Sequence, residues 1–189
     1  MLYLKRTEKS IDRMVSIVED LESITKLESG ELKLNMVKFD IVKTVKDVFE
    51  MEHWQAKERS ISLEIVNPPL KPVYVKADRN RILEVLTNLI VNGIKYGKKE
   101  GYVQVSFHDM DDNLMVEVSD NGIGIEKKHL PRVFERFYRA DKSRSREQGG
   151  TWLGLSIVKH IIEAHNQSIH VRSVVDQGTT FNFTLEKAK

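Results

Sequence analysis

A short acidic and glycine-containing segment, Asp120-Asn121-Gly122-Ile123-Gly124-Ile125, directly follows an apolar stretch that alternates like a strand. A carboxylate at a strand end offers one fixed hydrogen-bond acceptor, and nearby glycines let backbone approach a flat ligand closely. Asp-Asn-Gly is also a common turn sequence. This segment alone therefore supports either a ligand loop or a plain turn.

A second glycine cluster, Gly149-Gly150-Thr151-Trp152-Leu153-Gly154-Leu155, opens an expected helix. Backbone N–H groups at a helix start carry partial positive charge and bind phosphate. Between the two clusters, residues 127–146 include eight basic and two acidic residues, so this window has a formal charge of +6 and the rest of the chain −4. The window suits an anionic ligand, although a solvated charge run has the same composition.

A third set of polar residues, Asn88, Asn92, Lys95 and Tyr96, has helical spacing. Steps of four, three and one place them along one side of a helix. An Asn oxygen is a suitable hard ligand for Mg²⁺, which also takes phosphates and waters, and Lys95 can meet a phosphate as a point charge. Helix capping and solvation explain each residue singly, but the three sets together favour one nucleotide site.

The elements that must position these residues are mixed. Apolar spacings of three and four predict one helix over residues 1–29, ended by Gly30. Period and capping predict a helix over residues 40–57 with Asp40 as its N-cap, and further helices over residues 126–134 and 151–164. One more helix is predicted to begin at the N-cap Asp78 and to have an apolar face formed by Ile82, Val85, Leu86, Leu89 and Ile90. Alternation predicts strands over residues 31–38, 61–66, 73–76, 102–107, 114–118, 169–174 and 180–185, and residues 137–150 read as irregular.

The composition is that of an ordinary globular chain: 189 residues, net charge +2, 40% hydrophobic and no cysteine. A disulfide framework and a cysteine-ligated zinc site are excluded. Apolar runs are far shorter than the roughly 20 residues that span a bilayer, and the N-terminus lacks the apolar core of a signal peptide. We therefore expect a cytoplasmic-type protein or fragment.

Five segments in this order resemble the catalytic, ATP-binding domain of bacterial sensor histidine kinases. They are LTNLIVNGIKYG at 86–97 (N box), SDNGIGI at 119–125 (G1 box), FERFYR at 134–139 (F box), GGTWLGL at 149–155 (G2 box) and GTTF at 178–181 (closing Gly-Thr box). The resemblance implies an α+β fold, a two-layer α/β sandwich of the histidine kinase, Hsp90 and type II topoisomerase ATPase type, preceded by a long N-terminal helix. Residues 1–29 would be the second helix of the dimerisation and phosphotransfer hairpin, and residues 30–189 the catalytic domain, with an ATP lid at about 135–150.

The resemblance also implies roles for individual residues. Asp120 would accept a hydrogen bond from the adenine amino group, with Ile125, Tyr96 and Thr179 around the base. Asn92 would hold Mg²⁺ with Asn88 beside it, and the catalytic candidates are Asn88, Lys95 and Arg139. Further ATP-binding positions by resemblance are Gly122, Gly124, Phe137, Tyr138, Lys142, Gly150, Thr151, Leu153, Gly154 and Leu155.

The implied activity is that of a protein-histidine kinase, which transfers the ATP γ-phosphoryl group to a histidine. In related hydrolases a water-activating Glu precedes the metal-binding Asn by one turn; Asn88 stands there and cannot act as a general base. None of the six histidines has the acceptor context, so we expect the acceptor on a hairpin helix outside this chain. The implied partners are that helix and a cognate response regulator, without nucleic acid, and the implied location is the soluble cytoplasmic part of a membrane-anchored kinase.

Three residues depart from the family pattern. Trp152 replaces the middle glycine of the G2 box, which predicts weakened or altered ATP binding. Glu22 stands at a core position of the hairpin seam and disfavours a homodimer through residues 1–29. Gly93 lies inside a helix, where it should cost roughly 0.5–1 kcal/mol relative to Ala.

Two other functions fit the same residues. One is a catalytically impaired nucleotide-binding or interaction module, in which Trp152 has abolished turnover and the helical arm serves for docking. The other is an anti-sigma-type Ser/Thr kinase, which shares the fold but usually lacks the arm and the long F box. The residue that becomes phosphorylated distinguishes the three.

Overall fold

The computed structural model describes residues 33–138 and 153–188, together with residues 7, 11, 14, 15, 17–19, 21, 22 and 24–26 near the N-terminus. In chain order the elements are β1 (Met36–Asp40), α2 (Ile41–Glu58), β2 (Ser62–Ile65), β3 (Tyr74–Asp78), α3 (Arg79–Tyr96), β4 (Tyr102–Met110), β5 (Asn113–Asp120), the short 3₁₀ helix η1 (Leu130–Arg132), α4 (Gly154–Ala164), β6 (Ile169–Val174) and β7 (Gly178–Glu186). Across these described ranges, no helix is both long and apolar enough for a membrane span.

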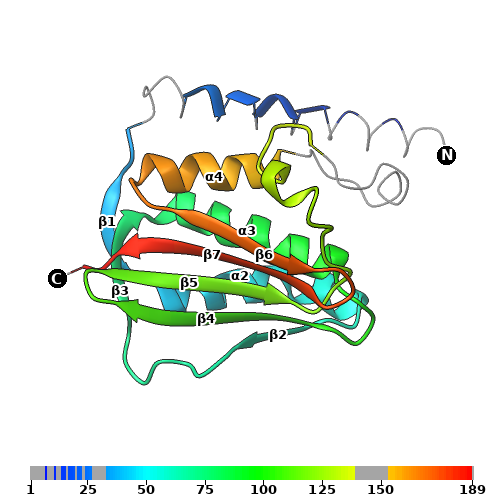
Figure 1. Cartoon of the computed structure of the whole chain (residues 1–189). Helices are drawn as coiled ribbons and strands as arrows, with labels where there is room; N and C mark the ends of the chain where they lie inside the picture. The colour runs from blue at the N-terminus through cyan, green and yellow to red at the C-terminus, as the bar shows by residue number, and fades with distance from the viewer. Residues whose placement is uncertain are drawn as a thin grey trace.

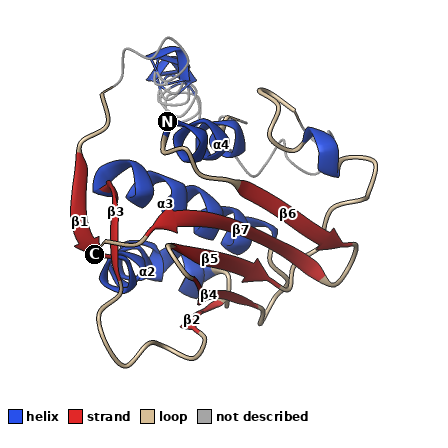
Figure 2. Cartoon of the chain, turned by 60° about the vertical axis from the view of Figure 1, so that its left-hand side comes forward, coloured by secondary structure: helices blue, strands red, loops and turns tan. Residues whose placement is uncertain are grey.

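The larger sheet has five strands in the order β2-β4-β5-β7-β6, and only the β2–β4 pair is parallel. Helices α2, α3 and α4 lie on one face of this sheet (Figure 1, Figure 2). A separate antiparallel pair of β1 and β3 lies at one end of the helical layer. The predicted two-layer α+β sandwich is therefore confirmed.

The core forms where the helices meet the sheet. In β5 and β7, Val116 pairs with Phe183 and Val118 with Phe181, and all four side chains are buried toward the helices. Each such side chain contributes roughly 1.5–3 kcal/mol of burial free energy. The predicted apolar face of α3 is buried throughout: Ile82, Val85, Leu86, Leu89 and Ile90.

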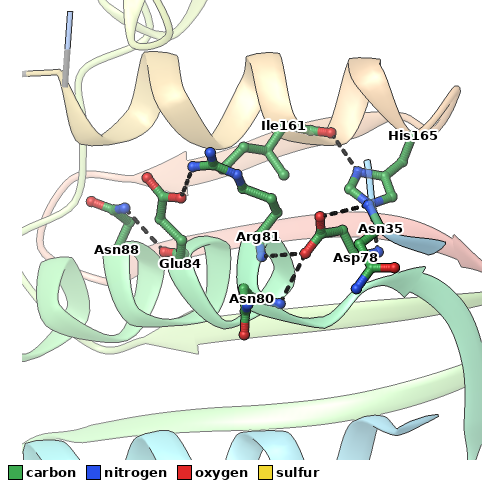
Figure 3. Close-up of polar contacts among 8 residues, drawn as sticks. All are labelled: Asn35, Asp78, Asn80, Arg81, Glu84, Asn88, Ile161 and His165. Carbon is green, nitrogen blue, oxygen red and sulfur yellow. Dashed lines mark hydrogen bonds and ion pairs between the residues drawn. The ribbon is translucent and has the colours of Figure 1, made fainter. Parts of the chain in front are cut away.

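Both predicted N-caps are present. The Asp40 carboxylate accepts a hydrogen bond from Val42 N at the start of α2, and Asp78 accepts from Asn80 N and Arg81 N at the start of α3 (Figure 3). These local signals fixed both helix starts correctly.

Several element boundaries differ from the predictions. The expected helix over 126–134 is reduced to η1, which contains Pro131, a residue without an N–H for helical hydrogen bonding. Of the expected strand over 31–38, residues 33–35 lie before β1, which begins at Met36, and the preceding Asn35 N donates to the Asp78 side chain instead of to a ladder; residues 31 and 32 lie outside the described residues. Helix α4 begins at Gly154; Thr151 and Trp152 lie outside the described residues.

The described residues of the N-terminal arm at positions 11–26 are helical and lie over α4 in both views (Figure 1, Figure 2). Ile24 is fully buried, with Ile17 and Leu21 half-buried against the same core. On the arm's other side, Ile11, Met14, Val15 and Val18 are 50–63% exposed. The apolar residues whose spacing predicted this helix are thus divided between the core and solvent.

Candidate functional site

The site begins in one row of side chains across the sheet. Asp120 in β5 pairs with Thr179 in β7, and Thr179 pairs with Ser173 in β6. Directly paired residues point to the same face, and this row continues the helix-covered face by one step beyond Val118 and Phe181. Polar groups therefore appear where the apolar core ends.

Asp120 holds one oxygen inside the fold and leaves the other open. Its Oδ1 accepts hydrogen bonds from Gly122 N at 2.8 Å and Thr179 N at 3.3 Å. No described residue hydrogen-bonds to Oδ2. Burial raises the pKa of the carboxyl, and the two backbone hydrogen bonds oppose that rise. The result is a fixed, desolvated acceptor.

Two glycines around Asp120 adopt backbone conformations that side chains resist. Gly124 has φ +69° and Gly178 has φ +124°. A Cβ at Gly178 would lie 1.9 Å from the Asp120 carbonyl oxygen, and one at Gly124 would lie 2.1 Å from that of Val174. These turns thus bring backbone of β5 and of the β6–β7 connection into direct contact.

The loop after Asp120 docks onto the end of α3. Ile123 N donates to Tyr96 O at 3.1 Å, and Ile123 O accepts from Asp176 N at 2.8 Å. Lys98 Nζ donates to the carbonyl oxygen of Asp176. The Asp-Asn-Gly segment is therefore a turn whose backbone polar groups are partly used by the fold, and it holds Asp120 in place.

Ser173 connects three backbone segments of this region and was not anticipated from the sequence. Its Oγ accepts from Ile125 N at 2.8 Å, donates to Gly178 O at 2.8 Å and lies 2.9 Å from Thr179 Oγ1. Only strand register brings Ser173 beside Thr179. The predicted pairing of strands 169–174 and 180–185 around their turn was the one signal in the sequence that could have placed Ser173 opposite Thr179.

Gly93 lets α3 pack closely against the sheet that carries the row of Asp120, Thr179 and Ser173. A Cβ there would lie 2.7 Å from Val103 Cγ2 and 3.5 Å from Asp120 Cβ. The expected helix penalty is accompanied by a gain, because the missing side chain lets α3 pack closely on β4 and β5 beside Asp120.

A second group of residues lies between α3 and α4. Asn88 Nδ2 donates to Glu84 O at 3.0 Å, and Asn88 Oδ1 would lie 2.4 Å from a Cβ at Gly154 (Figure 3). The amide oxygen thus rests against the start of α4, which begins without a side-chain cap. Half-buried Asn92, one turn on, has no hydrogen-bond partner for its amide in the part of the chain described.

Glu84 is occupied elsewhere. Its carboxylate forms an ion pair with Arg81 at 2.9 Å (Figure 3). At the other end of the helix pair, His165 accepts from Asp78 N through Nε2 at 3.0 Å and donates from Nδ1 to Ile161 O at 2.7 Å. His165 thus ties the end of α4 to the start of α3.

The remaining predicted residues divide into several groups. Lys95 Nζ lies 5.2 Å from the centre of the Tyr96 ring. Leu153 is buried and Leu155 half-buried, so their side chains pack inward. Arg139, Lys142, Gly150 and Thr151 lie outside the described residues, as does Trp152.

The start of the expected lid is anchored by aromatic residues. Phe134 packs edge-on against Phe181, with ring centres 6.2 Å apart. The Tyr138 hydroxyl lies 2.6 Å from His129 Nδ1, and its ring stacks with Arg132 at 4.2 Å. Phe137, predicted to bind ATP, has φ +59° and is 52% exposed.

Comparisons with known proteins agree with this architecture. Residues 77–189 match the family model of histidine kinase-, DNA gyrase B- and HSP90-like ATPases. The sensor histidine kinase WalK of Bacillus subtilis is 38% identical over 97% of this chain and 30% of its own length, and the Staphylococcus aureus WalK is 33% identical over 97% and 44%. A crystal structure of full-length ShkA in complex with AMPPNP superposes with TM-score 0.84 at 26% identity, covering 98% of this chain and 39% of that chain.

The chain belongs to the family of histidine kinase-, DNA gyrase B- and HSP90-like ATPases. Within it, the chain is homologous to WalK sensor histidine kinases and contains a histidine kinase-type ATP-binding catalytic domain. It spans less than half the length of the WalK relatives named here.

Proposed function

We propose that this chain binds ATP with Mg²⁺ and transfers the γ-phosphoryl group to a histidine on a phosphotransfer hairpin. The observation that carries the proposal is Asp120, a desolvated carboxylate with one oxygen fixed by backbone N–H groups and the other open. An open carboxylate oxygen at the end of an apolar core matches the exocyclic amino group of adenine. Ile125 and Tyr96 would supply the surfaces for the base.

The asparagines of α3 fit a magnesium ion that arrives with phosphates. The described residues contain no cluster of three His, Asp or Glu side chains that could hold a metal alone. Mg²⁺ needs few protein ligands when phosphates and waters supply the rest, and the Asn92 amide, which has no hydrogen-bond partner among the described residues, offers one. When bound, the ion neutralises charge on the phosphates. Asn88 and Lys95 are placed on the same helix to orient and contact them.

Phosphoryl transfer is favoured over hydrolysis by the residues around Asn92. Asn88 occupies the preceding turn and lacks a basic group. Glu84, one turn further, is paired with Arg81. Neither residue is placed to activate water, so the described residues around Asn92 serve to position the nucleotide, which is the usual demand of phosphoryl transfer.

The partners follow from the same proposal. Residues 1–29 would form the second helix of the hairpin, and the acceptor histidine would lie on the first. A response regulator would then receive the phosphoryl group; a solved structure of the histidine kinase ThkA in complex with the response regulator TrrA shares this fold. Glu22, exposed and paired with Lys26 at 2.6 Å, still disfavours a homodimer seam on that side of the arm.

The test is phosphoryl transfer from γ-labelled ATP to the separately supplied hairpin of a WalK relative. We expect acid-labile, base-stable label on the hairpin histidine, and none with Asp120→Asn. Stable label on Ser or Thr would favour the anti-sigma-type kinase. Nucleotide binding without label would favour the impaired module, and would agree with the effect predicted for Trp152.

A further inference from the structure

We infer that Ser173 fixes the direction of the Thr179 hydroxyl proton and thereby makes the base pocket accept an amino group and reject a carbonyl group. Ser173 would be a positioning residue for adenine-over-guanine selectivity. The inference rests on the proposed function, because it concerns the nucleotide held at Asp120. It arises from the three contacts of Ser173 and from its place in the row beside Thr179.

The direction of each hydrogen bond follows from counting protons. A serine hydroxyl has one proton and two lone pairs. Ile125 N–H can only donate, so one lone pair of Ser173 accepts it. The Gly178 carbonyl can only accept, so the Ser173 proton points to it. The contact between the Ser173 and Thr179 hydroxyls at 2.9 Å must then be donated by Thr179.

Thr179 therefore has no proton left for a ligand. Its Oγ1 can only accept, and it lies between Ser173 and Asp120 in the same row. The open oxygen of Asp120 is also an acceptor. Two neighbouring acceptors suit the amino group at position 6 of adenine, which has two protons, either directly or through a water. The carbonyl oxygen at position 6 of guanine would face both without a donor.

Removing the Ser173 hydroxyl would release the Thr179 proton. In Ser173→Ala, Thr179 could turn its proton toward the pocket and donate to a guanine carbonyl, while it could still accept from an adenine amino group. The change should thus appear as tighter guanine binding, with adenine binding little altered. A loosening of the fold alone would weaken both nucleotides.

The experiment compares ADP and GDP affinities by calorimetry, with Mg²⁺, in the full chain. The native protein should prefer ADP by about 100-fold, and Ser173→Ala should lower that ratio about tenfold, mainly through GDP. Ser173→Thr keeps the hydroxyl on a residue common in strands and should keep the native ratio.

Ser119→Ala is the matched control. Ser119 Oγ lies 3.0 Å from Thr180 Oγ1, a similar hydroxyl pair on the same strands but one residue off the Asp120 row, and so on the opposite sheet face. The ADP-to-GDP affinity ratio of Ser119→Ala should equal that of the native protein. If Ser173→Ala fails to fold, Thr179→Val decides: it should lower the ratio about tenfold through weaker ADP binding, because one acceptor is lost.

The outcomes separate the two proposals. Absence of ADP binding in the native protein would overturn the proposed function and this inference together. If the native protein binds ADP but Ser173→Ala leaves the ADP-to-GDP affinity ratio unchanged, this inference alone would be overturned. The same conclusion would follow if Ser119→Ala lowered the ratio as much as Ser173→Ala does. An unchanged ratio in Thr179→Val would likewise show that the hydroxyl does not read the base.

Discussion

The two ends of the proposed nucleotide site are formed by different kinds of structure. At the base end, Asp120, Thr179 and Ser173 are held by strand register, backbone hydrogen bonds and glycine turns. At the phosphate end, the polar groups are the side chains of Asn88 and Asn92 on a helix surface that faces the start of α4.

The two ends differ in how many of their polar groups are hydrogen-bonded within the fold before a ligand binds. Each described hydrogen bond at the base end satisfies a group of the fold itself, so its acceptors are preorganised. At the phosphate end Asn92 has no described partner, and Asn88 spends its N–H on a carbonyl of its own helix. Obstructing the glycine turns at the base end should therefore cost stability, whereas removing a side-chain amide at the phosphate end should cost ligand affinity.

The strongest way to break this contrast is to add a methyl group at each end. Gly178→Ala would place Cβ against the Asp120 carbonyl oxygen at a φ of +124°, so we expect a loss of about 3 kcal/mol in the free energy of unfolding. Gly154→Ala would meet only the movable end of the Asn88 side chain, and its stability should stay within about 1 kcal/mol. Urea unfolding measures both, and equal losses would contradict the contrast.

Removing the Asn92 amide sharpens the phosphate side of the comparison. Asn92→Ala should weaken Mg²⁺–ATP binding by at least about tenfold, because a metal ligand is lost. Its unfolding free energy should change by no more than about 0.5 kcal/mol, since no described group depends on the amide. ADP affinity measured without Mg²⁺ serves as the internal control and should be native. A large stability loss would show a structural role instead.

The buried carboxyl of Asp120 makes the base end sensitive to pH. Its pKa is raised by burial, and the carboxylate accepts from an amino group more strongly than the protonated carboxyl does. ADP affinity should therefore fall as pH decreases through that raised pKa, by at most about tenfold per pH unit for one proton. Calorimetry from pH 8 down to the lowest pH at which the chain stays folded measures this, and a pH-independent ADP affinity over that range would contradict it.

Stability should respond in the opposite sense. The folded carboxyl binds its proton more tightly than the unfolded one, whose ordinary pKa is 3.8. Its contribution to stability is thus present below pH 3.8 and is lost as pH rises through the raised folded pKa. Asp120→Asn cannot titrate, so its melting temperature should exceed the native value at neutral pH. A lower melting temperature would contradict the assigned burial effect.

The smallest expected effect relieves strain beside the base end. Asp176 has φ +61°, and it contributes its backbone N–H to Ile123 and its carbonyl to Lys98. Asp176→Gly keeps both backbone groups and removes the left-handed penalty, so stability should rise by about 1 kcal/mol. Thermal unfolding tests it; a decrease would mean that the carboxylate itself stabilises the turn.

Local signals in the sequence located much of this architecture. Asp40 and Asp78 were predicted as caps and act as caps, because an N-cap depends on the next three residues only. The buried face of α3 followed from its period. The placement of Asn88 and Asn92 along one side of this helix could also be predicted, because residues four apart lie one helical turn from each other.

Features that depend on distant segments were beyond that reasoning. Ser173 meets Ile125 and Gly178 only through the pairing of β6 with β7 and the docking of the β5 loop. The close packing that Gly93 allows is against Val103, a residue of another element. The arm's buried face was ambiguous for the same reason: period locates apolar residues, but contact with the core decides that Ile24 is buried and Val18 exposed.

The most direct measurement is the ADP affinity of Asp120→Asn against the native protein. The amide oxygen must take the inner position, because Gly122 N and Thr179 N both donate there, so the amide N–H₂ would replace the open acceptor. We predict ADP binding about 100-fold weaker, with GDP binding not weakened. ADP affinity within threefold of native would contradict the claim that Asp120 reads the base.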